Sequence, residues 1–390
     1  MRVHHQLKAF EQLLQHYNGN LPLHRFLPAY FKQNKQMGSS DRRWATRHLY
    51  SFFRLGKALA NLTAEERLSV ADFLCHDSLS LITEKNLPEL ASEVSAPFQE
   101  KLELISAKYP DFNLAEVYPF NAHLSEAVDT IEFYESFFKQ PDLFIRVAAD
   151  AVSSIKLKLE AADIPVKQIT ETALSLPNGT KLEGVLQEGS FQVQDLSSQH
   201  TGSYFKPNKW DKWWDCCAAS GGKTLLLHSL EPVLDLLVSD LRESVLLNLD
   251  ERFRLAGIRK YHKKELDLLK NNDQILHHYA FDGIILDAPC TGSGTWGRTP
   301  EMLTFFEERK IGQFATMQKA IVQHVVKYLK PGKPLIYITC SAFAEENEEV
   351  VKFITENLPM ELESMELIKG YRQHADTMFV ARLIKKGEGQ

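Results

Sequence analysis

Two cysteines follow short apolar segments, which is where a parallel sheet presents reactive groups. Cys290 comes three residues after Asp287, at the end of the apolar segment 283–287, and Cys340 directly follows segment 334–339. Ligands of open α/β sheets bind beyond the carboxyl ends of the strands, so both thiols are expected at one site. A lone cysteine is more often a small buried apolar residue. A pair at such a place favours covalent catalysis by a thiolate.

A turn of small residues joins the apolar segment 213–216 to the helical segment 225–230. Small side chains let the backbone approach a ligand closely, and a helix start offers free N–H groups. The sequence Gly222-Lys223-Thr224 resembles part of a P-loop, but that motif needs glycine where Cys217 stands. The turn therefore predicts a site for an anionic or carboxylate group that is not a P-loop.

Two further aspartates are candidates for this ligand site. Asp240 ends segment 234–239, 25 residues after Asp215, where a nucleotide-binding fold places an acidic residue on ribose hydroxyls. The competing interpretation of Asp240 is a helix N-cap. Asp267 follows a third possible strand, where an adenine contact and a solvated surface charge are both open.

Apolar periodicity divides the 390 residues into three predicted domains. Residues 1–138 show helical spacing throughout, and Ser40 or Asp41 is expected to cap one helix. Residues 139–190 indicate a small α+β module with an extended segment at 186–193. Residues 191–390 alternate strands with helices, which predicts a parallel sheet covered on both faces. The strands expected in that sheet are 213–216, 234–239, 283–287 and 334–339.

These motifs resemble, over residues 140–385, the Sun family of ribosomal RNA cytosine-5 methyltransferases. The segments that carry the resemblance are Gln194-Asp195 with Ser197-Ser198-Gln199, residues 217–224, residues 287–292, Arg298 with Pro300, and Thr339-Cys340-Ser341 with Glu345-Glu346-Asn347.

The resemblance implies a Rossmann-like class I methyltransferase core that uses S-adenosyl-L-methionine and methylates carbon 5 of cytosine. Cys340 would be the nucleophile, Cys290 would assist release of the product, and Asp287 would lie at the pyrimidine ring. The residues implied to bind the cofactor are Cys217, Ala218, Ala219, Ser220, Gly221, Gly222, Lys223, Asp240, Asp267 and Asp287.

Two parts of the sequence depart from the family's usual pattern. Ser220 replaces a proline that is common in the family's loop, and segment 376–379 stands where paired aromatics are usual. The acidic run 345–349 is expected to open a helix, where its charge suits the N-terminal dipole.

The remaining parts of the chain resemble RNA-binding modules. Residues 1–130 are similar to the helical domain of the antitermination factor NusB, and the middle module is similar to an RNA-recognition-like domain that carries Arg146 on a strand. We expect these parts to hold RNA, with Arg298 on a phosphate.

Composition sets limits on class and partners. The net charge is -6, yet residues 1–60 hold ten Lys and Arg against two acidic residues, whereas residues 61–145 hold five against sixteen. The first segment is either a phosphate-contacting surface or one basic face of a helical domain. With five cysteines, no signal peptide and no apolar run of about 20 residues, we expect a cytoplasmic protein with free thiols, off the membrane. We also expect a monomer without metal.

Two other functions compete with cytosine methylation. A methyltransferase for an adenine amine or a protein would need no cysteine pair, because an amine is already nucleophilic. A non-catalytic RNA-binding factor would keep the fold but not the chemistry. Ribosomal RNA is the expected substrate, and transfer RNA is the alternative.

Overall fold

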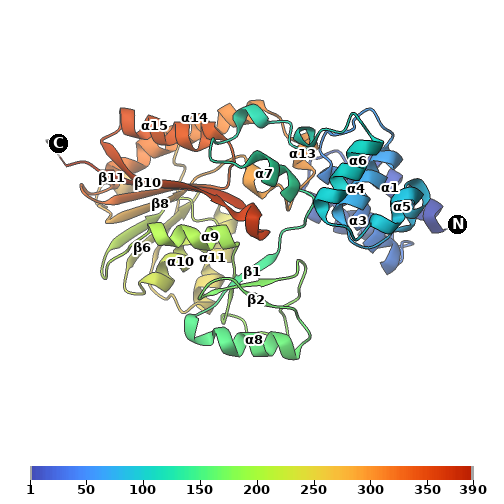
Figure 1. The fold of residues 1–390 in the computed structure, drawn as a ribbon. Coiled ribbons are helices and arrows are strands. Elements are labelled where there is room, and N and C mark those ends of the chain that lie inside the picture. Colours follow the sequence, from blue (N-terminus) through green and yellow to red (C-terminus); the bar gives the residue numbers. More distant parts are fainter. Residues whose placement is uncertain (1, 388–390) are drawn as a thin grey trace. The chain divides into compact units, whose positions relative to one another are not determined.

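The computed structural model describes residues 2–387 and separates the chain into two compact units (Figure 1). The helical unit comprises residues up to Ala122, Asp129–Gln140 and Trp296–Glu308. The sheet unit comprises His123–Val128, Pro141–Thr295 and the residues from Arg309 onward. This division differs from the three predicted segments, because the small module shares a unit with the large sheet.

Helices build the whole of the first unit, as the apolar spacing predicts. Its helices are α1 (Arg2–His16), α2 (Leu23–Gln33), α3 (Ser39–Arg54), α4 (Ala64–Cys75), α5 (Leu81–Asn86), α6 (Phe98–Lys108), α7 (Thr130–Ser136) and α13 (Met302–Phe305), with 3₁₀ turns η1 (Pro88–Glu93) and η2 (Leu114–Val117). A third turn, η3 (Asn121–His123), lies where the chain leaves this unit. Phe10, Leu49 and Phe53 form the centre of the buried cluster between the first helices.

Local signals explain where two of these helices begin. Thr63 caps α4 by accepting a hydrogen bond from the Glu66 N–H, and the Glu66 carboxylate accepts one from the Thr63 N–H in return. At α3 the N-cap is Gly38, not Ser40 or Asp41 as predicted. Asp41 lies one turn inside the helix, where its carboxylate accepts the Gly38 N–H at 3.3 Å.

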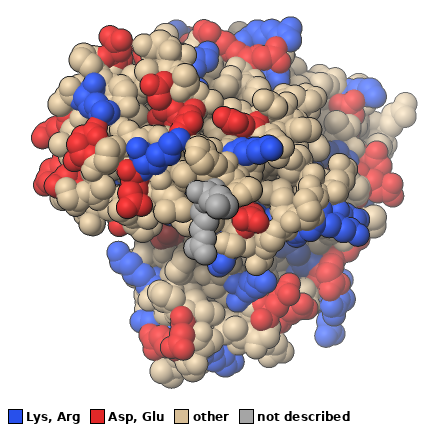
Figure 2. All heavy atoms as spheres, turned by 90° about the vertical axis from the view of Figure 1, so that its right-hand side faces the viewer, with Lys and Arg blue, Asp and Glu red and all other residues tan. Residues whose placement is uncertain are grey.

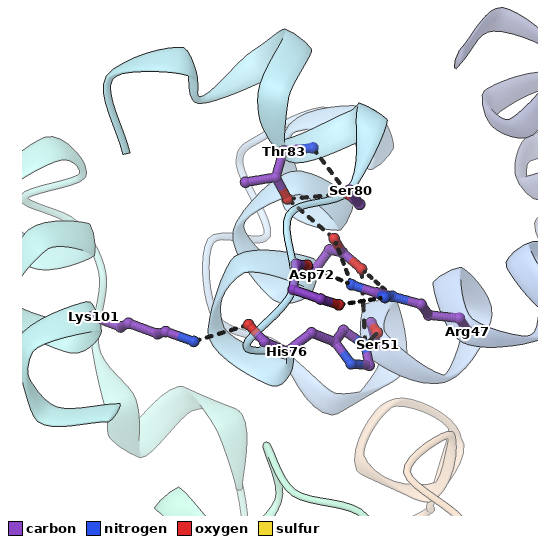
Figure 3. A network of polar contacts seen from close by, with 8 residues as sticks. Arg47, Ser51, Asp72, His76, Ser80, Thr83 and Lys101 are labelled. Atoms are coloured by element: carbon purple, nitrogen blue, oxygen red, sulfur yellow. Dashed lines mark hydrogen bonds and ion pairs between the residues drawn. The ribbon is translucent and has the colours of Figure 1, made fainter. Parts of the chain in front are cut away.

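A buried ion pair links the basic and the acidic stretches of the helical unit (Figure 3). Asp72, 1% exposed, accepts a hydrogen bond from Arg47 Nε at 2.9 Å and another from Thr83 Oγ1 at 3.0 Å. Lys101, also buried, donates to the backbone oxygen of His76 at 2.9 Å. Arg47 and Lys101 therefore hold helices together.

The charge expected at the N-terminal surface is consequently reduced. Arg54 is 3% exposed and donates to the backbone oxygens of Phe137 and Gly297, so its charge lies in the interior. On the face drawn in Figure 2, Lys and Arg side chains alternate with Asp and Glu side chains. The local excess of basic residues does not make a uniformly basic surface on that face.

Residues 296–308 complete the helical unit although they follow the Cys290 motif in sequence. Trp296 is 1% exposed, and its ring lies 5.6 Å from those of Tyr118 and Phe120. The carboxylate of Glu301, also buried, accepts the Leu23 N–H at 2.9 Å, where α2 begins. This segment from the C-terminal half of the sequence thus supplies part of the helical core.

The small module of the sheet unit is a four-stranded antiparallel sheet with strand order β2-β3-β1-β4. Its elements are β1 (Leu143–Arg146), η4 (Ala149–Ala151), α8 (Val152–Ala161), β2 (Lys167–Gln168), β3 (Ala173–Leu176) and β4 (Gln192–Val193). Ile145, Ile155 and Leu174 belong to the apolar cluster between α8 and the strands. The extended segment expected at 186–193 is wrong for residues 186–191, which form turns around Gly189.

The large sheet has seven strands in the order β10-β11-β9-β8-β5-β6-β7. Its strands are β5 (Lys212–Asp215), β6 (Asp235–Asp240), β7 (His262–Glu265), β8 (Gly283–Asp287), β9 (Pro334–Thr339), β10 (Met360–Lys369) and β11 (Thr377–Lys385). Around them lie α9 (Leu196–His200), η5 (Thr201–Tyr204), α10 (Gly222–Leu230), α11 (Glu243–Leu255), α12 (Asp273–Leu276), η6 (Ser293–Thr295), α14 (Arg309–Val325), η7 (Val326–Tyr328), η8 (Ala344–Glu346), α15 (Glu348–Asn357) and η9 (Gly370–Gln373).

The predicted Rossmann-like α/β class is confirmed, with one addition at the edge of the sheet. The five strands β5 to β9 run parallel, whereas β11 pairs antiparallel with both β9 and β10. Residues 377–379 of the segment 376–379 therefore start β11, next to β9, which Cys340 directly follows. Among the described residues, no helix is both long and apolar enough to span a bilayer.

Candidate active site

The two cysteines meet at the carboxyl ends of adjacent strands. β8 and β9 are paired in parallel, with Asp287 opposite Ile338. The Sγ atoms of Cys290 and Cys340 lie 3.2 Å apart, and both side chains are partly exposed. The sulfur contact with Cys340, and then burial, raise the pKa of Cys290 well above its ordinary value. Cys290 is thus suited to hold a proton beside Cys340.

Backbone contacts keep the Cys290 loop (residues 288–295) against the Cys340 turn (residues 340–343). The Gly294 N–H donates to the Cys340 oxygen at 2.9 Å, and the Ala342 N–H donates to Ser293 Oγ at 2.9 Å. A Cβ on Gly294 would lie 2.1 Å from the Thr377 oxygen, so no larger residue fits.

The cofactor turn after β5 has the backbone that its small residues permit. Ala219 and Gly221 both have positive φ angles, of +45° and +84°. A Cβ on Gly221 would meet the Phe253 ring at 2.5 Å, whereas a Cβ on Gly222 would have no atom within 4 Å. Gly222 opens α10 and faces free space, which fits a ligand seated at that helix start.

Asp240 faces this turn from the end of β6. Its carboxylate accepts the Ala219 N–H at 3.0 Å and the Arg242 N–H at 3.0 Å. The N-cap of α11 is Arg242, so the competing interpretation of Asp240 as the helix cap is wrong. The side chain holds the turn and lies where a ribose is expected.

Other residues of the turn are fixed by neighbours. The Ala218 N–H donates to the Ser239 oxygen at 2.8 Å, and Arg252 donates to Ser220 Oγ at 2.8 Å. Arg252 anchors the loop where the family commonly has proline. Cys217 is partly exposed beside the buried Cys216.

Asp215 is a buried carboxylate at the end of β5 that the sequence did not mark as functional. Its Oδ2 accepts a hydrogen bond from Thr224 Oγ1 at 2.6 Å, while its Oδ1 has no hydrogen-bond partner. Burial raises the pKa of Asp215 to about 7. An unsatisfied buried acceptor at the cofactor turn is a group that a donor on a ligand would satisfy.

Lys223 connects the cofactor turn to Asp287, which ends the strand before Cys290. Its ammonium, nearly fully buried, donates to Asp287 Oδ2 at 3.0 Å and to Ser198 Oγ at 2.9 Å. Ser198 also accepts from Gln194 Nε2 at 3.2 Å, and Gln194 Oε1 accepts from Arg146 Nε at 3.0 Å. The motif at 194–199 therefore orients Lys223.

Arg146 lies in its expected strand, but it contacts protein. Besides Gln194 it donates to Ser229 Oγ at 2.7 Å, and burial lowers its pKa to about 10. Asp267 lies two residues beyond β7, where it accepts the Leu269 N–H at 3.0 Å and pairs with Lys270. Arg298 belongs to segment 296–308 of the helical unit.

Glu346 was expected to open a helix together with the other acidic residues of the run 345–349, but the structure gives it a different place. The expected helix is opened by Glu348 and Glu349, whereas Glu346 precedes it and is 0% exposed. Its carboxylate faces the loops of both cysteines. Its place in the acidic run does not distinguish it, because only the tertiary contacts show that Glu346 is buried whereas Glu349 is exposed.

Comparison with known proteins concerns mainly the C-terminal half of the chain. Residues 203–387 match the family model described as 16S rRNA methyltransferase RsmB/F. This matched segment is similar to a methyltransferase domain of the Sun family. It spans β5 to β11 and so contains the cofactor turn and both cysteines.

Curated relatives of this chain are named as methyltransferases of small-subunit ribosomal RNA. Ribosomal RNA small subunit methyltransferase B of Salmonella newport (strain SL254) is 31% identical over 208 residues, which cover 51% of this chain and 48% of that protein. The enzyme of the same name from Salmonella heidelberg (strain SL476) is 30% identical over 213 residues. The chain spans about half the length of the curated relatives it matches.

Solved structures share the fold. The crystal structure of PH0851 has a TM-score of 0.68 at 24% identity and covers 91% of this chain and 93% of its own. NSun6 from Pyrococcus horikoshii, solved with SFG, has a TM-score of 0.60 at 18% identity and covers 67% of this chain and 95% of its own. The fold of the chain is therefore shared with these two solved structures.

Proposed function

We propose that this protein transfers a methyl group from S-adenosyl-L-methionine to carbon 5 of a cytosine in RNA, and that the substrate is ribosomal RNA. The observation that carries the proposal is the pair of sulfur atoms 3.2 Å apart. They follow the neighbouring strands β8 and β9, and β8 ends in Asp287, the partner of Lys223. A nucleophile for carbon 6 and a polar group for the ring are thereby combined next to the cofactor turn.

Covalent attack solves the chemical problem of an unreactive carbon. In the proposed first step the Cys340 thiolate bonds to carbon 6 of cytosine, and the ring electrons move toward nitrogen 3. At this part of the ring Lys223 would supply a proton donor and Asp287 a carboxylate. Carbon 5 then becomes an enamine carbon that can attack an electrophile.

The cofactor supplies that electrophile, a methyl group on a sulfonium. Asp240 and the backbone of residues 217–222 are the groups that would hold it, and Asp215 Oδ1 is an acceptor for one of its donors. After the transfer, carbon 5 carries both a methyl group and a proton. A base removes this proton, the bond between Cys340 and carbon 6 breaks, and the double bond returns. We assign proton removal to Cys290, whose sulfur lies next to Cys340. Once Cys340 is bonded to carbon 6, the Cys290 thiol gives its own proton to solvent, and the resulting thiolate takes the carbon 5 proton.

An RNA substrate is supported by the names of the matched family and of the curated relatives. A base within a duplex cannot offer carbon 6 to a thiol, so the target is unpaired or flipped out at a cost of a few kcal/mol. The helical unit and the small module are the proposed RNA-holding parts.

The test uses RNA in which the target carries 5-fluorocytidine, because fluorine cannot leave as a proton does. With S-adenosyl-L-methionine the protein is expected to form a covalent adduct that survives denaturing electrophoresis. Without such an adduct from the wild-type protein the covalent route would be wrong.

Bisulfite sequencing of total RNA from a deletion strain identifies the substrate. A lost signal in small-subunit ribosomal RNA supports the proposed substrate, whereas a lost signal in transfer RNA would make transfer RNA the substrate. No lost signal, together with no cofactor binding in calorimetry, would leave a non-catalytic RNA-binding factor.

A further inference from the structure

Glu346 is a fully buried carboxylate that contacts the residue following each cysteine. Its Oε2 accepts the Thr291 N–H at 2.9 Å, and its Oε1 accepts hydrogen bonds from the hydroxyls of Thr291 and Ser341, both at 2.5 Å. Thr291 follows Cys290, and Ser341 follows Cys340. One side chain thus connects the two loops directly beside their sulfur atoms.

Gln318 extends this connection to the other side of Cys290. From α14 its Nε2 donates to Glu346 Oε2 at 3.0 Å and to the Pro289 oxygen at 2.9 Å. The peptide oxygen before Cys290 and the peptide N–H after it are therefore held by the Glu346–Gln318 pair. Both side chains are 0% exposed, so water does not compete for these bonds.

The two oxygens of Glu346 have different kinds of hydrogen-bond partner, and this difference predicts which substitutions keep the contacts. The two groups on Oε2 are N–H donors, which can only donate. The two groups on Oε1 are hydroxyls, which can donate or accept. A glutamine in this place can put its oxygen toward the N–H groups and its NH₂ toward the hydroxyls.

We propose that Glu346 is a positioning residue that holds the Cys290 loop and the Cys340 turn together, so that the two thiols of the proposed methyl-transfer reaction stay within contact distance. This inference rests on the proposed function for its consequence in catalysis. The geometric part, which is the separation of the two sulfurs, stands independently of it.

We call the Glu346 side chain with its four hydrogen bonds the Glu346 clamp. The clamp depends on the length of the side chain and on the geometry of its acceptors, and the variants separate these two properties from its charge. Glu346→Gln keeps all four contacts without the charge, Glu346→Ala removes them, and Glu346→Asp keeps the charge on a side chain one methylene shorter. Glu349→Ala is the matched control, because Glu349 is exposed in the first turn of α15. Thermal unfolding shows which variants are folded.

The first measurement needs no RNA. The full chain is reduced, treated with diamide, and analysed by peptide mass spectrometry for a Cys290–Cys340 disulfide, in which two thiols lose two electrons and two protons to the diazene oxidant. Bond formation requires the sulfurs to approach from 3.2 Å to about 2.05 Å. We expect Glu346→Gln and Glu349→Ala to cross-link at the wild-type rate. Glu346→Asp, and Glu346→Ala where it folds, should cross-link at least about tenfold more slowly.

The second measurement is single-turnover methylation, where a misplacement of about 1 Å can cost about 100-fold. A loss of about 100-fold in Glu346→Asp with near wild-type activity in Glu346→Gln supports the clamp. Equal cross-linking by wild type and Glu346→Asp would overturn it, as would a Glu346→Gln protein as impaired as Glu346→Asp. If the wild-type protein methylates no RNA, the proposed function fails while the cross-linking rates still test the clamp.

Discussion

The sulfur atoms of Cys290 and Cys340 lie 3.2 Å apart although 50 residues separate them in sequence. Their strands are neighbours in the sheet, and the Gly294 N–H holds the Cys340 carbonyl at 2.9 Å. The two sulfur atoms contact each other directly, and while Cys340 is free this contact raises the pKa of Cys290 and keeps the proton on that sulfur.

The two cysteines should therefore fail in different ways when each is replaced by alanine. We expect Cys340→Ala to abolish turnover and adduct formation, because the nucleophile is lost. Cys290→Ala should still attack, but it should accumulate a covalent RNA adduct because the carbon 5 proton is not removed. Electrophoresis of unmodified RNA with each variant measures this. Normal turnover by Cys340→Ala with loss in Cys290→Ala would exchange the two roles.

The Lys223–Asp287 pair should be needed for the chemical step. Lys223→Met removes a buried ammonium that contacts Asp287 at 3.0 Å, and loss of one such electrostatic group typically lowers kcat about 100-fold or more. Single-turnover methylation measures the effect. Lys209→Met, at an exposed lysine beside Trp210, is the control and should retain activity. Equal rates for both variants would remove Lys223 from the mechanism.

Gly294 should tolerate no side chain. A Cβ at this position would lie 2.1 Å from the Thr377 oxygen and 3.0 Å from the Cys340 oxygen, so the loop must move away from β11. We expect Gly294→Ala to lower methylation about 100-fold, as a displaced catalytic group does. Gly312→Ala, where a Cβ meets nothing within 4 Å, is the control. Full activity in Gly294→Ala would show that the loop can shift without harm.

Acid should destabilise the helical unit through His48. This residue is 0% exposed and neither ring nitrogen has a hydrogen-bond partner, so burial lowers its pKa to about 4, with Asp72 and Arg47 as its charged neighbours. An unfolded histidine has a pKa of about 6.5, so between these values the unfolded chain binds more protons.

The unfolding free energy should accordingly fall as the pH drops from about 6.5 toward 4, by about 2 to 3 kcal/mol from this residue. Denaturant unfolding followed at several pH values measures the slope. His48→Leu should flatten the slope, whereas replacing the exposed His24 by glutamine should leave it unchanged. A His48→Leu protein with the wild-type slope would contradict this origin.

Segment 296–308 should contribute to the stability of the helical unit. Trp296→Ala opens a cavity beside Tyr118 and Phe120, which typically costs about 3 to 5 kcal/mol for a buried aromatic residue. Thermal and denaturant unfolding measure the loss. Ile131→Ala, at a residue that is 64% exposed in the same unit, should change stability by less than about 0.5 kcal/mol.

The sequence by itself determined the elements that carry the chemistry. Apolar runs 283–287 and 334–339 are strands with those bounds, because continuous apolar segments bounded by turn residues are typical of a doubly covered sheet. Cys290, Cys340 and Asp287 were placed at its carboxyl edge by the same rule. The motif spacing and the family resemblance identified the cofactor turn.

Only the tertiary structure decided which side chains those elements bring together. Charge counted along residues 1–60 did not reveal that Arg47 and Arg54 are used inside the helical unit. The acidic run 345–349 did not distinguish the buried Glu346 from the exposed Glu349, and residues 296–308 gave no sign that they complete the core of the helical unit. Each of these three features depends on contacts between residues that are distant in sequence. Burial by such contacts decides whether a charge or an aromatic ring stabilises the interior or faces solvent. The local sequence pattern does not show which residues are buried in this way.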